Sequence, residues 1–165
     1  MIRLEHVLVA TDFSEPSDVA LSYAREFARQ FGATLHVLHV VDDVGARAPG
    51  FPELAGNLGQ LQVEMESTAR MKADALLSDE DRDQLHARAV INTSLSPAHA
   101  ILSYARDERV NLIIIGTHGR GGVARFVMGS VAERVVRSAT CPVLTVHHPE
   151  REFVRADALQ AVERV

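Results

Sequence analysis

Residues 110–146 read VNLIIIGTHGRGGVARFVMGSVAERVVRSATCPVLTV, and this stretch contains the signals that decide the fold. It opens with a nearly unbroken run of leucine and β-branched residues up to Ile115, which is typical of a parallel strand buried on both faces. Glycines follow, and then residues 130–136, SVAERVV, predict a helix entered through a small residue. Residues 141–146, CPVLTV, predict another strand that begins at a proline. The stretch therefore predicts a strand, a glycine-rich loop, a helix and a further strand.

The loop after the first of these strands has the spacing Gly116-x2-Gly119-x9-Gly129-Ser130. A helix N-terminus attracts anions because its first N–H groups are unpaired and the helix dipole is positive there. Glycines let the backbone come close to a phosphate chain, and Ser130 adds a hydroxyl donor. Residues 130–133, SVAE, also fit a capping box, in which Ser130 only caps the helix. From these residues alone, anion binding and capping stay open as alternatives.

The rest of the chain alternates between strand and helix patterns. Strands are predicted at residues 4–10, 34–40 and 86–91, and helices between Ser14 and Gly32, from Leu54 to Leu76, and from Pro97 to Ala105. Residues 42–59 are rich in glycine and proline and predict a long loop that could fold over a ligand. The acidic residues 78–83 predict a solvated turn rather than a metal site. We interpret His36 and His39 as satisfied, half-buried side chains on one face of the second strand, because no third metal ligand can be identified.

Five strands that alternate with helices predict a single-domain α/β fold, with an open parallel sheet and helices on both faces. The natural order of the five strands is 3-2-1-4-5. Ligands of such sheets bind at the carboxyl ends of the two strands that flank the point where the order reverses. Those ends are Ala10-Thr11-Asp12 and Gly116-Thr117-His118-Gly119. Topology and glycine spacing therefore predict the same place for a binding site.

Composition excludes several classes of function. The chain has 165 residues, as expected for one domain, and a formal net charge of −5 with its basic residues scattered among acids. We therefore do not expect nucleic acid as a partner, and with 5% aromatic residues and no tryptophan the chain lacks stacking platforms. The single cysteine, Cys141, excludes an internal disulfide, and no apolar run approaches the roughly 18 residues of a membrane span. These features predict a cytoplasmic protein without membrane insertion.

Together, these patterns resemble the universal stress protein family, in its ATP-binding class. The resemblance rests on the glycine spacing, on residues 7–14, VLVATDFS, and on residues 39–42, HVVD, which are similar to the ends of the family's first two strands. It covers residue 3 to about residue 147 and departs at Ala10, where a proline is common, and at residues 95–97, where a glycine often sits. It implies an adenine nucleotide alpha hydrolase-like fold. The implied nucleotide-binding domain spans residues 1–148, and residues 149–165 would form a C-terminal extension with a short helix.

The resemblance also implies a ligand, which would be ATP, ADP or AMP. The Val40 backbone would form hydrogen bonds with the edge of the adenine, and the side chains of Ala10 and Ile115 would pack beside the base. Asp12 and Gly116 would lie near the ribose. The full set of residues implied to bind nucleotide is Ala10, Thr11, Asp12, Val40, Ile115, Gly116, His118, Gly119, Arg120, Gly121, Gly122, Gly129, Ser130 and Val131. Magnesium or manganese would be held mainly by the phosphates, with Asp12 as the one candidate side-chain ligand. A homodimer formed through the last strand is implied as well.

We therefore predict a dimeric ATP-binding regulator or sensor of the stress response, in which ATP occupancy changes the lid loop and the dimer surface. Two alternatives stay open: a dimeric protein-interaction module that binds no nucleotide, and a slow ATPase. The sequence contains neither a Gly-x4-Gly-Lys-Ser/Thr loop nor a Gly-x-Ser-x-Gly elbow, so no catalytic residue is assigned. Slow hydrolysis or self-phosphorylation is left open, without a base that could drive it.

Overall fold

The computed structural model describes residues 1–47, 55–117 and 128–147. Within them, five parallel strands form one sheet in the order β3-β2-β1-β4-β5, which confirms the predicted topology. The strands are β1 (His6–Ala10), β2 (Thr34–Val41), β3 (Arg88–Thr93), β4 (Leu112–Gly116) and β5 (Val143–Val146). The helices are α1 (Glu15–Phe31), α2 (Val44–Arg47), α3 (Ala55–Ala75), α4 (Asp79–Gln84), α5 (Pro97–Asp107) and α6 (Ser130–Ser138). The predicted extension at 149–165 lies outside the described residues.

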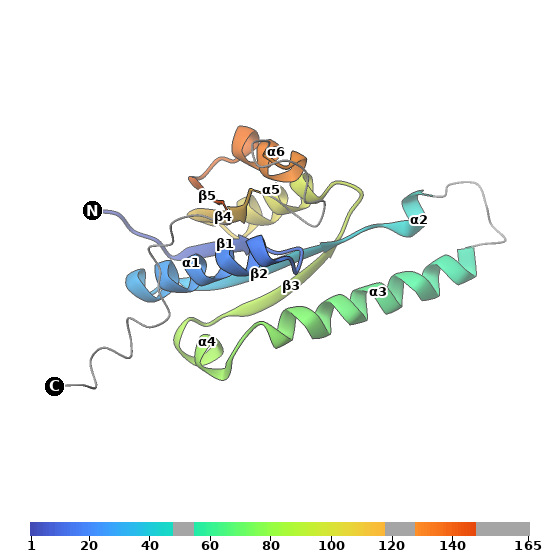
Figure 1. Cartoon of the computed structure of the whole chain (residues 1–165), viewed down its shortest axis with the longest axis horizontal. Coiled ribbons are helices and arrows are strands. Elements are labelled where there is room, and N and C mark those ends of the chain that lie inside the picture. Colours follow the sequence, from blue (N-terminus) through green and yellow to red (C-terminus); the bar gives the residue numbers. More distant parts are fainter. Residues whose placement is uncertain (48–54, 118–127, 148–165) are drawn as a thin grey trace.

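Helices cover both faces of the sheet, with α5 and α6 on one side and α1 and α3 on the other (Figure 1). Successive residues of a strand point to opposite faces, so a continuous apolar run such as β4 needs cover on both. Ile113 and Ile115 accordingly pack in the cluster that includes α5 and α6. Ile114 packs in the cluster that includes α1. This two-sided burial explains why the run from Val110 to Ile115 carries no polar alternation.

Helix α1 connects the first two strands and has the ends that the sequence predicts. Ser14 is its N-cap, Pro16 lies in its first turn, and Gly32 follows its last residue with a left-handed φ of 63°. The helix buries a stripe of mostly small side chains, which lets it lie close to the sheet; the stripe contains Ser17, Ala20, Leu21, Tyr23, Ala24 and Ala28. Its position places the Thr11–Ser14 turn directly at the carboxyl end of β1.

Two predictions for the connections were wrong. Residues 42–59 are not one loop, because α2 occupies Val44–Arg47 and α3 already begins at Ala55. The acidic segment 78–83 is not a solvated turn, because α4 forms there and Asp81 is 3% exposed. Asp81 accepts hydrogen bonds from Nε of Arg25 to both of its oxygens, at 3.1 Å each. A buried carboxylate needs such a partner, and this one lies 56 residues earlier in the chain.

Both histidines of β2 have hydrogen-bonding partners, as predicted, but the prediction that they lie half-buried on one face was wrong. His36 and His39 are three residues apart in the sequence and therefore lie on opposite faces of the strand. His36 is fully buried, where it lies 2.7 Å from the hydroxyl of Tyr104 through Nδ1 and 3.1 Å from Nδ1 of His6 through Nε2. Burial, followed by the nearby Arg88 and His6, lowers the pKa of His36 to about 3. The imidazole is therefore a neutral member of a buried polar network.

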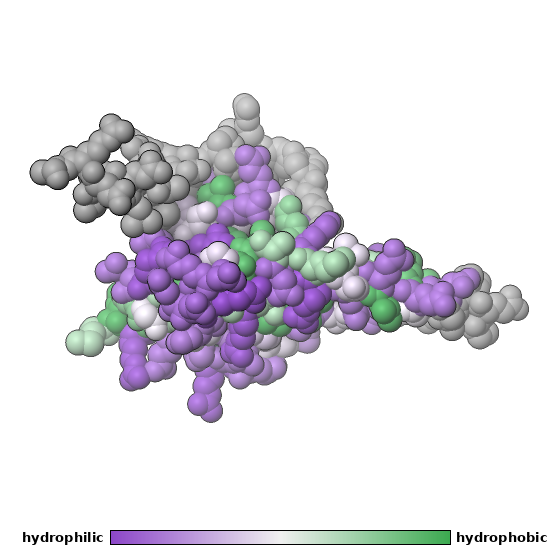
Figure 2. Space-filling model, turned by 90° about the horizontal axis from the view of Figure 1, so that it is seen from below, coloured by the Kyte–Doolittle hydropathy of each residue, from purple (hydrophilic) through white to green (hydrophobic). Residues whose placement is uncertain are grey.

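Helix α3 lies along the outer part of the molecule and carries several exposed apolar side chains. Figure 2 views the molecule from below the orientation of Figure 1 and shows mostly hydrophilic residues on this face, interrupted by small hydrophobic areas. Leu61, Val63 and Met71 of α3 are 44%, 67% and 64% exposed. In the part of the chain that the structure describes, no helix combines the length and apolar character that a membrane crossing requires.

Candidate functional site

The carboxyl ends of β1 and β4 lie side by side, as the topology requires. Ala10 pairs in register with Ile115, and both side chains are on the sheet face covered by α5 and α6. Ala10 is 9% exposed and Ile115 5% exposed, and the partly buried Val40 packs against the same cluster. The structure thus brings together the three residues predicted to surround a base. They form a small apolar wall at the point where the strand order reverses.

The backbone of β2 continues past the end of β1 and leaves a hydrogen-bonding edge there. Leu38 accepts a hydrogen bond from the N–H of Thr11, on the β1 side, whereas Val41 accepts one from Ser94, on the β3 side. Backbone groups in a strand alternate between its two neighbours, so the N–H and C=O of Val40 are directed to the β1 side. The strand β1 has already ended at that level, because its last pair joins Ala10 to Leu38. A planar ligand edge could occupy this position and take the place of a strand.

Side chains of the following turn hold Asp12 in a defined orientation. One carboxylate oxygen, Oδ1, accepts hydrogen bonds from the N–H of Ser14 at 3.1 Å and from its hydroxyl at 2.5 Å. The hydroxyl of Thr11 is 3.0 Å from the hydroxyl of Ser17 and accepts from the N–H of Phe13 at 3.0 Å. Thr11 was predicted to belong to a ligand site, and the partners of its hydroxyl are Phe13 of the turn and Ser17 of α1.

Negative charge gathers around this turn. Burial raises the pKa of Asp18 in α1, and the Asp12 carboxylate raises it further, while Arg25 acts in the opposite direction. Carboxylates repel phosphates, but they accept hydrogen bonds from hydroxyl groups. This end of the site is therefore suited to a sugar hydroxyl and unsuited to a phosphate chain.

Gly116 has a packing role that the sequence did not reveal. A Cβ on this residue would lie 3.1 Å from the carbonyl oxygen of Pro16 and 3.3 Å from its Cβ. The end of β4 therefore comes so close to the first turn of α1 that a Cβ would require the Pro16 backbone to shift by a few tenths of an ångström. This glycine lets the end of β4 lie close to the first turn of α1.

The N-terminus of α6 lies against the end of β4, which places it at the same edge of the sheet. Gly129 is the N-cap, without a side-chain cap, and its N–H donates to the carbonyl of Thr117 at 2.7 Å. The capping box with Ser130 as the cap is therefore not formed, because Ser130 is the first helical residue and its side chain is exposed. In this structure the Gly129 amide bonds to Thr117, and its predicted contact with a phosphate stays a prediction. Among the described residues, no backbone carbonyl outside the helices and strands accepts a hydrogen bond from the N–H of Ser130 or Val131. These two N–H groups belong to the first turn of α6 and point out of the N-terminal end of the helix.

Several predicted site residues lie outside the described part of the chain. These are His118, Gly119, Arg120, Gly121 and Gly122, so their predicted contacts stay predictions. Among the described residues, no group of three or more histidine, cysteine, aspartate or glutamate side chains is arranged to hold a metal ion.

Sequence reasoning missed two residues next to Asp12. The rings of Phe13 and His39 are 4.3 Å apart at 34°, and Nδ1 of His39 is 2.8 Å from the carbonyl oxygen of Thr11. Phe13 has a left-handed φ of 64°, which a bulky residue rarely adopts. The position of His39 directly before Val40 was the only sequence signal for this contact.

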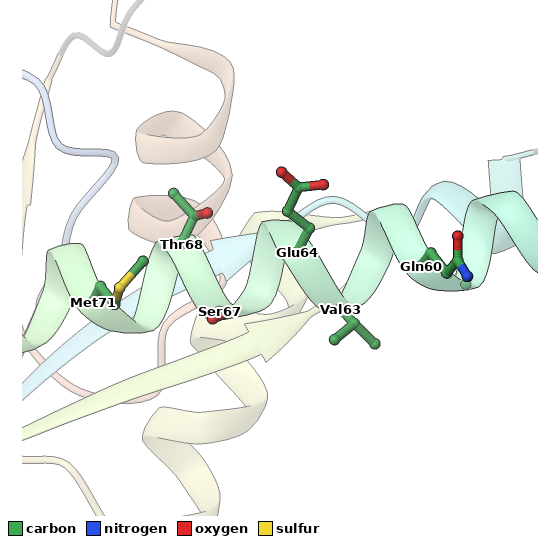
Figure 3. A pocket seen from close by; sticks show the side chains of 7 residues that line it. Gln60, Val63, Glu64, Ser67, Thr68 and Met71 are labelled. Atoms are coloured by element: carbon green, nitrogen blue, oxygen red, sulfur yellow. The ribbon is translucent and has the colours of Figure 1, made fainter.

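A separate hollow on α3 does not contribute to the site. It is lined by Gly59, Gln60, Val63, Glu64, Ser67, Thr68 and Met71, all of them from this one helix. Figure 3 shows that Val63 and Glu64 point in opposite directions from the helix, so the hollow is an open surface rather than an enclosed cavity. It contains one carboxylate, and none of the residues at the ends of β1 and β4.

The fold defines an open, doubly wound α/β protein, a class whose ligands bind at the switch point of the sheet. Comparison with known proteins makes this assignment specific. Residues 3–147 match the model of the universal stress protein family, and the chain belongs to that family.

Individual relatives agree with this membership. A universal stress protein from Methanocaldococcus jannaschii is 33% identical over 149 residues, which cover 88% of this chain and 84% of the relative. The solved structure of the universal stress protein UspA from Lactobacillus plantarum has 26% identity and a TM-score of 0.73, and the match covers 88% of this chain and 99% of that one. A universal stress protein from Archaeoglobus fulgidus, solved in complex with dAMP, shares the fold at 22% identity and a TM-score of 0.53, covering 88% and 99%.

Proposed function

We propose that this protein binds ATP, or a related adenine nucleotide, at the crevice between the ends of β1 and β4 and acts as a dimeric regulator of the stress response. A complex with dAMP in a structurally similar family member supports an adenine nucleotide as the ligand. Sequence reasoning had placed the ligand at the same strand ends. Divalent metal would be held mainly by the phosphates.

One observation carries the proposal. The backbone of Val40 is directed past the end of β1, beside the apolar pair Ala10 and Ile115, at the place where the strand order reverses. An adenine ring has a flat apolar face and an edge with a donor and an acceptor, so it satisfies both features together. These residues therefore fit the base of the proposed ligand.

The charges around the site indicate where the ribose and the phosphates of the nucleotide would lie. Asp12 accepts hydrogen bonds and stands near Asp18, so we place the ribose hydroxyls there and the phosphates away from it. The first turn of α6 lies beside Thr117, and its N–H groups with the exposed hydroxyl of Ser130 suit an anion. Gly119–Gly122, which lie outside the described residues, would complete the phosphate contacts as predicted from the glycine spacing.

Native mass spectrometry of the purified protein tests the proposal directly. Co-purified ATP or ADP is the expected result, and an empty protein whose mass is unmoved by added ATP would contradict it. Steady release of phosphate that stops in Ser130→Ala would instead identify a slow ATPase.

Calorimetric titration with ATP then tests the phosphate contact. Ser130→Ala should weaken binding about 10- to 150-fold, because a hydrogen bond to a charged group contributes about 1.5–3 kcal/mol. Ser138→Ala at the other end of α6 is the matched control and should bind as the wild type does. Gly119→Val should abolish binding, because its side chain would block the approach of the phosphates.

The dimer is the second part of the proposal, and the edge strand β5 is its expected interface. Pro142 and Val146 bond to β4 through their carbonyls, so the backbone groups of Thr145 are directed to the open edge. Thr145→Pro removes one outward N–H and should convert a dimer to a monomer in light scattering, with an unchanged circular dichroism spectrum. A variant that stays dimeric would place the interface elsewhere.

A further inference from the structure

His39 contacts the residues on both sides of Asp12. Its Nδ1 lies 2.8 Å from the carbonyl oxygen of Thr11, and its ring packs on Phe13 at a centroid distance of 4.3 Å. A carbonyl can only accept, so Nδ1 carries the hydrogen and donates it. The His39 side chain therefore holds the residue before Asp12 by a hydrogen bond and packs against the ring of the residue after it.

The turn that His39 fastens is strained. Phe13 has a φ of 64°, in a region that is unfavourable for a residue with a bulky side chain. Such a conformation persists only where the surroundings hold it in place. The surroundings here are His39 on one side of the Phe13 ring and the ammonium of Lys72, 5.8 Å from the ring centroid. These two ring contacts come from β2 and α3, so elements far away in the sequence add to the hydrogen bonds within the turn.

This arrangement does not face the proposed base. Odd-numbered residues of β2 such as Val37 point to the face covered by α1, and His39 is on that face. Ala10 and Val40 belong to the cluster on the opposite face. His39 and Phe13 therefore cannot contact a base beside Ala10, and any effect on that ligand must pass through the turn between the two faces.

We propose that His39 and Phe13 are positioning residues that present the Asp12 carboxylate to the ribose of the bound nucleotide. The proposal rests on the proposed nucleotide site and adds the device that orients one of its groups. Without the hydrogen bond from His39, the strained turn can relax toward an unstrained backbone, and that relaxation moves Asp12. The expected consequence is weaker nucleotide binding rather than loss of the fold.

A double-mutant cycle tests the proposal by calorimetric titration with ATP. His39→Phe keeps the ring contact and removes the donor, and it should weaken binding about tenfold. In an Asp12→Asn background the same change should weaken binding less than twofold, because the group that it positions is already altered. Phe31→Leu removes the exposed ring of the stacked Phe27–Phe31 pair and is the control for general loss of aromatic contact.

The outcomes separate the two proposals. ATP binding by the wild type with an unchanged affinity in His39→Phe would overturn the positioning role and leave the nucleotide site intact. An equal loss in both backgrounds would also overturn it, because a merely structural role does not couple to Asp12. Absence of ATP binding in the wild type would overturn both proposals. Should His39→Phe fail to fold by circular dichroism, Phe13→Leu enters the same cycle and is expected to show the same coupling.

Discussion

The buried His36 makes the stability of this protein dependent on pH, and the size of the effect can be worked out. The side chain is fully buried, and groups from three elements surround it: His6 of β1, Arg88 of β3 and Tyr104 of α5. Glu108, which follows α5, pairs with Arg88 at 2.7 Å. Burial is the largest cause that lowers the pKa of His36, from 6.5 to about 3, and the positive Arg88 acts in the same direction. The native state therefore keeps this imidazole neutral at pH values where the unfolded chain binds a proton.

The sign follows from proton uptake. Between about pH 6.5 and pH 3 the unfolded state holds one more proton at this site than the native state, so the free energy of unfolding falls as the pH falls. The contribution is complete above about pH 6.5, and at pH 5 it should be about 2 kcal/mol smaller than at pH 8.

Urea denaturation at pH 8 and pH 5 measures this difference. The wild type should lose about 2 kcal/mol more than His36→Leu between the two values, although the variant is less stable at both because the Tyr104 hydroxyl loses its partner. His99→Gln, an exposed position on α5, is the matched control and should follow the wild type. An identical pH dependence in the wild type and His36→Leu would refute the assignment of a neutral buried imidazole.

Two further substitutions test how the crevice and its support are packed. Gly116→Ala should lower the free energy of unfolding by about 1–3 kcal/mol, because its Cβ would lie 3.1 Å from the Pro16 carbonyl oxygen. Urea titration measures this change. An unchanged midpoint would show that the first turn of α1 moves freely. Asp81→Asn should cost about 2–4 kcal/mol by breaking the buried pair with Arg25, whereas Asp74→Asn, in a half-exposed pair, should cost under about 0.5 kcal/mol. Equal effects of the two changes would show that burial does not strengthen the first pair.

The local patterns of the chain were sufficient for much of the architecture. The apolar run before Gly116, the helical spacing between Ser14 and Gly32, and the alternation of elements predicted five parallel strands and their order. They also placed the ends of the first and fourth strands, at Ala10 and Gly116, side by side, because the ends of parallel strands meet at one edge of the sheet. These features can be predicted from the sequence because each pattern involves residues that are close together along the chain.

Local patterns failed where the contact partner lies far away in the chain. The acidic segment around Asp81 read as a solvated turn, because nothing near it indicates that Arg25 will arrive from α1. His36 and His39 were assigned to one face, although their spacing of three residues puts them on opposite faces. The loop prediction for residues 42–59 followed its glycines and prolines and missed α2 at Val44–Arg47, whereas the helix predicted from Leu54 is confirmed by α3, which begins at Ala55.

The sequence by itself determined the class of fold and the strand order, because hydrophobic periodicity and glycine positions are local properties. The edge of the sheet that it indicates for a ligand stays a prediction. Only the tertiary structure decided which groups at that edge are engaged by the protein itself. The amide of Gly129 bonds to Thr117, and His39 fastens the turn around Asp12. Such pairings depend on the distance and direction between elements that fold together from separate parts of the chain, and a one-dimensional pattern does not contain either quantity.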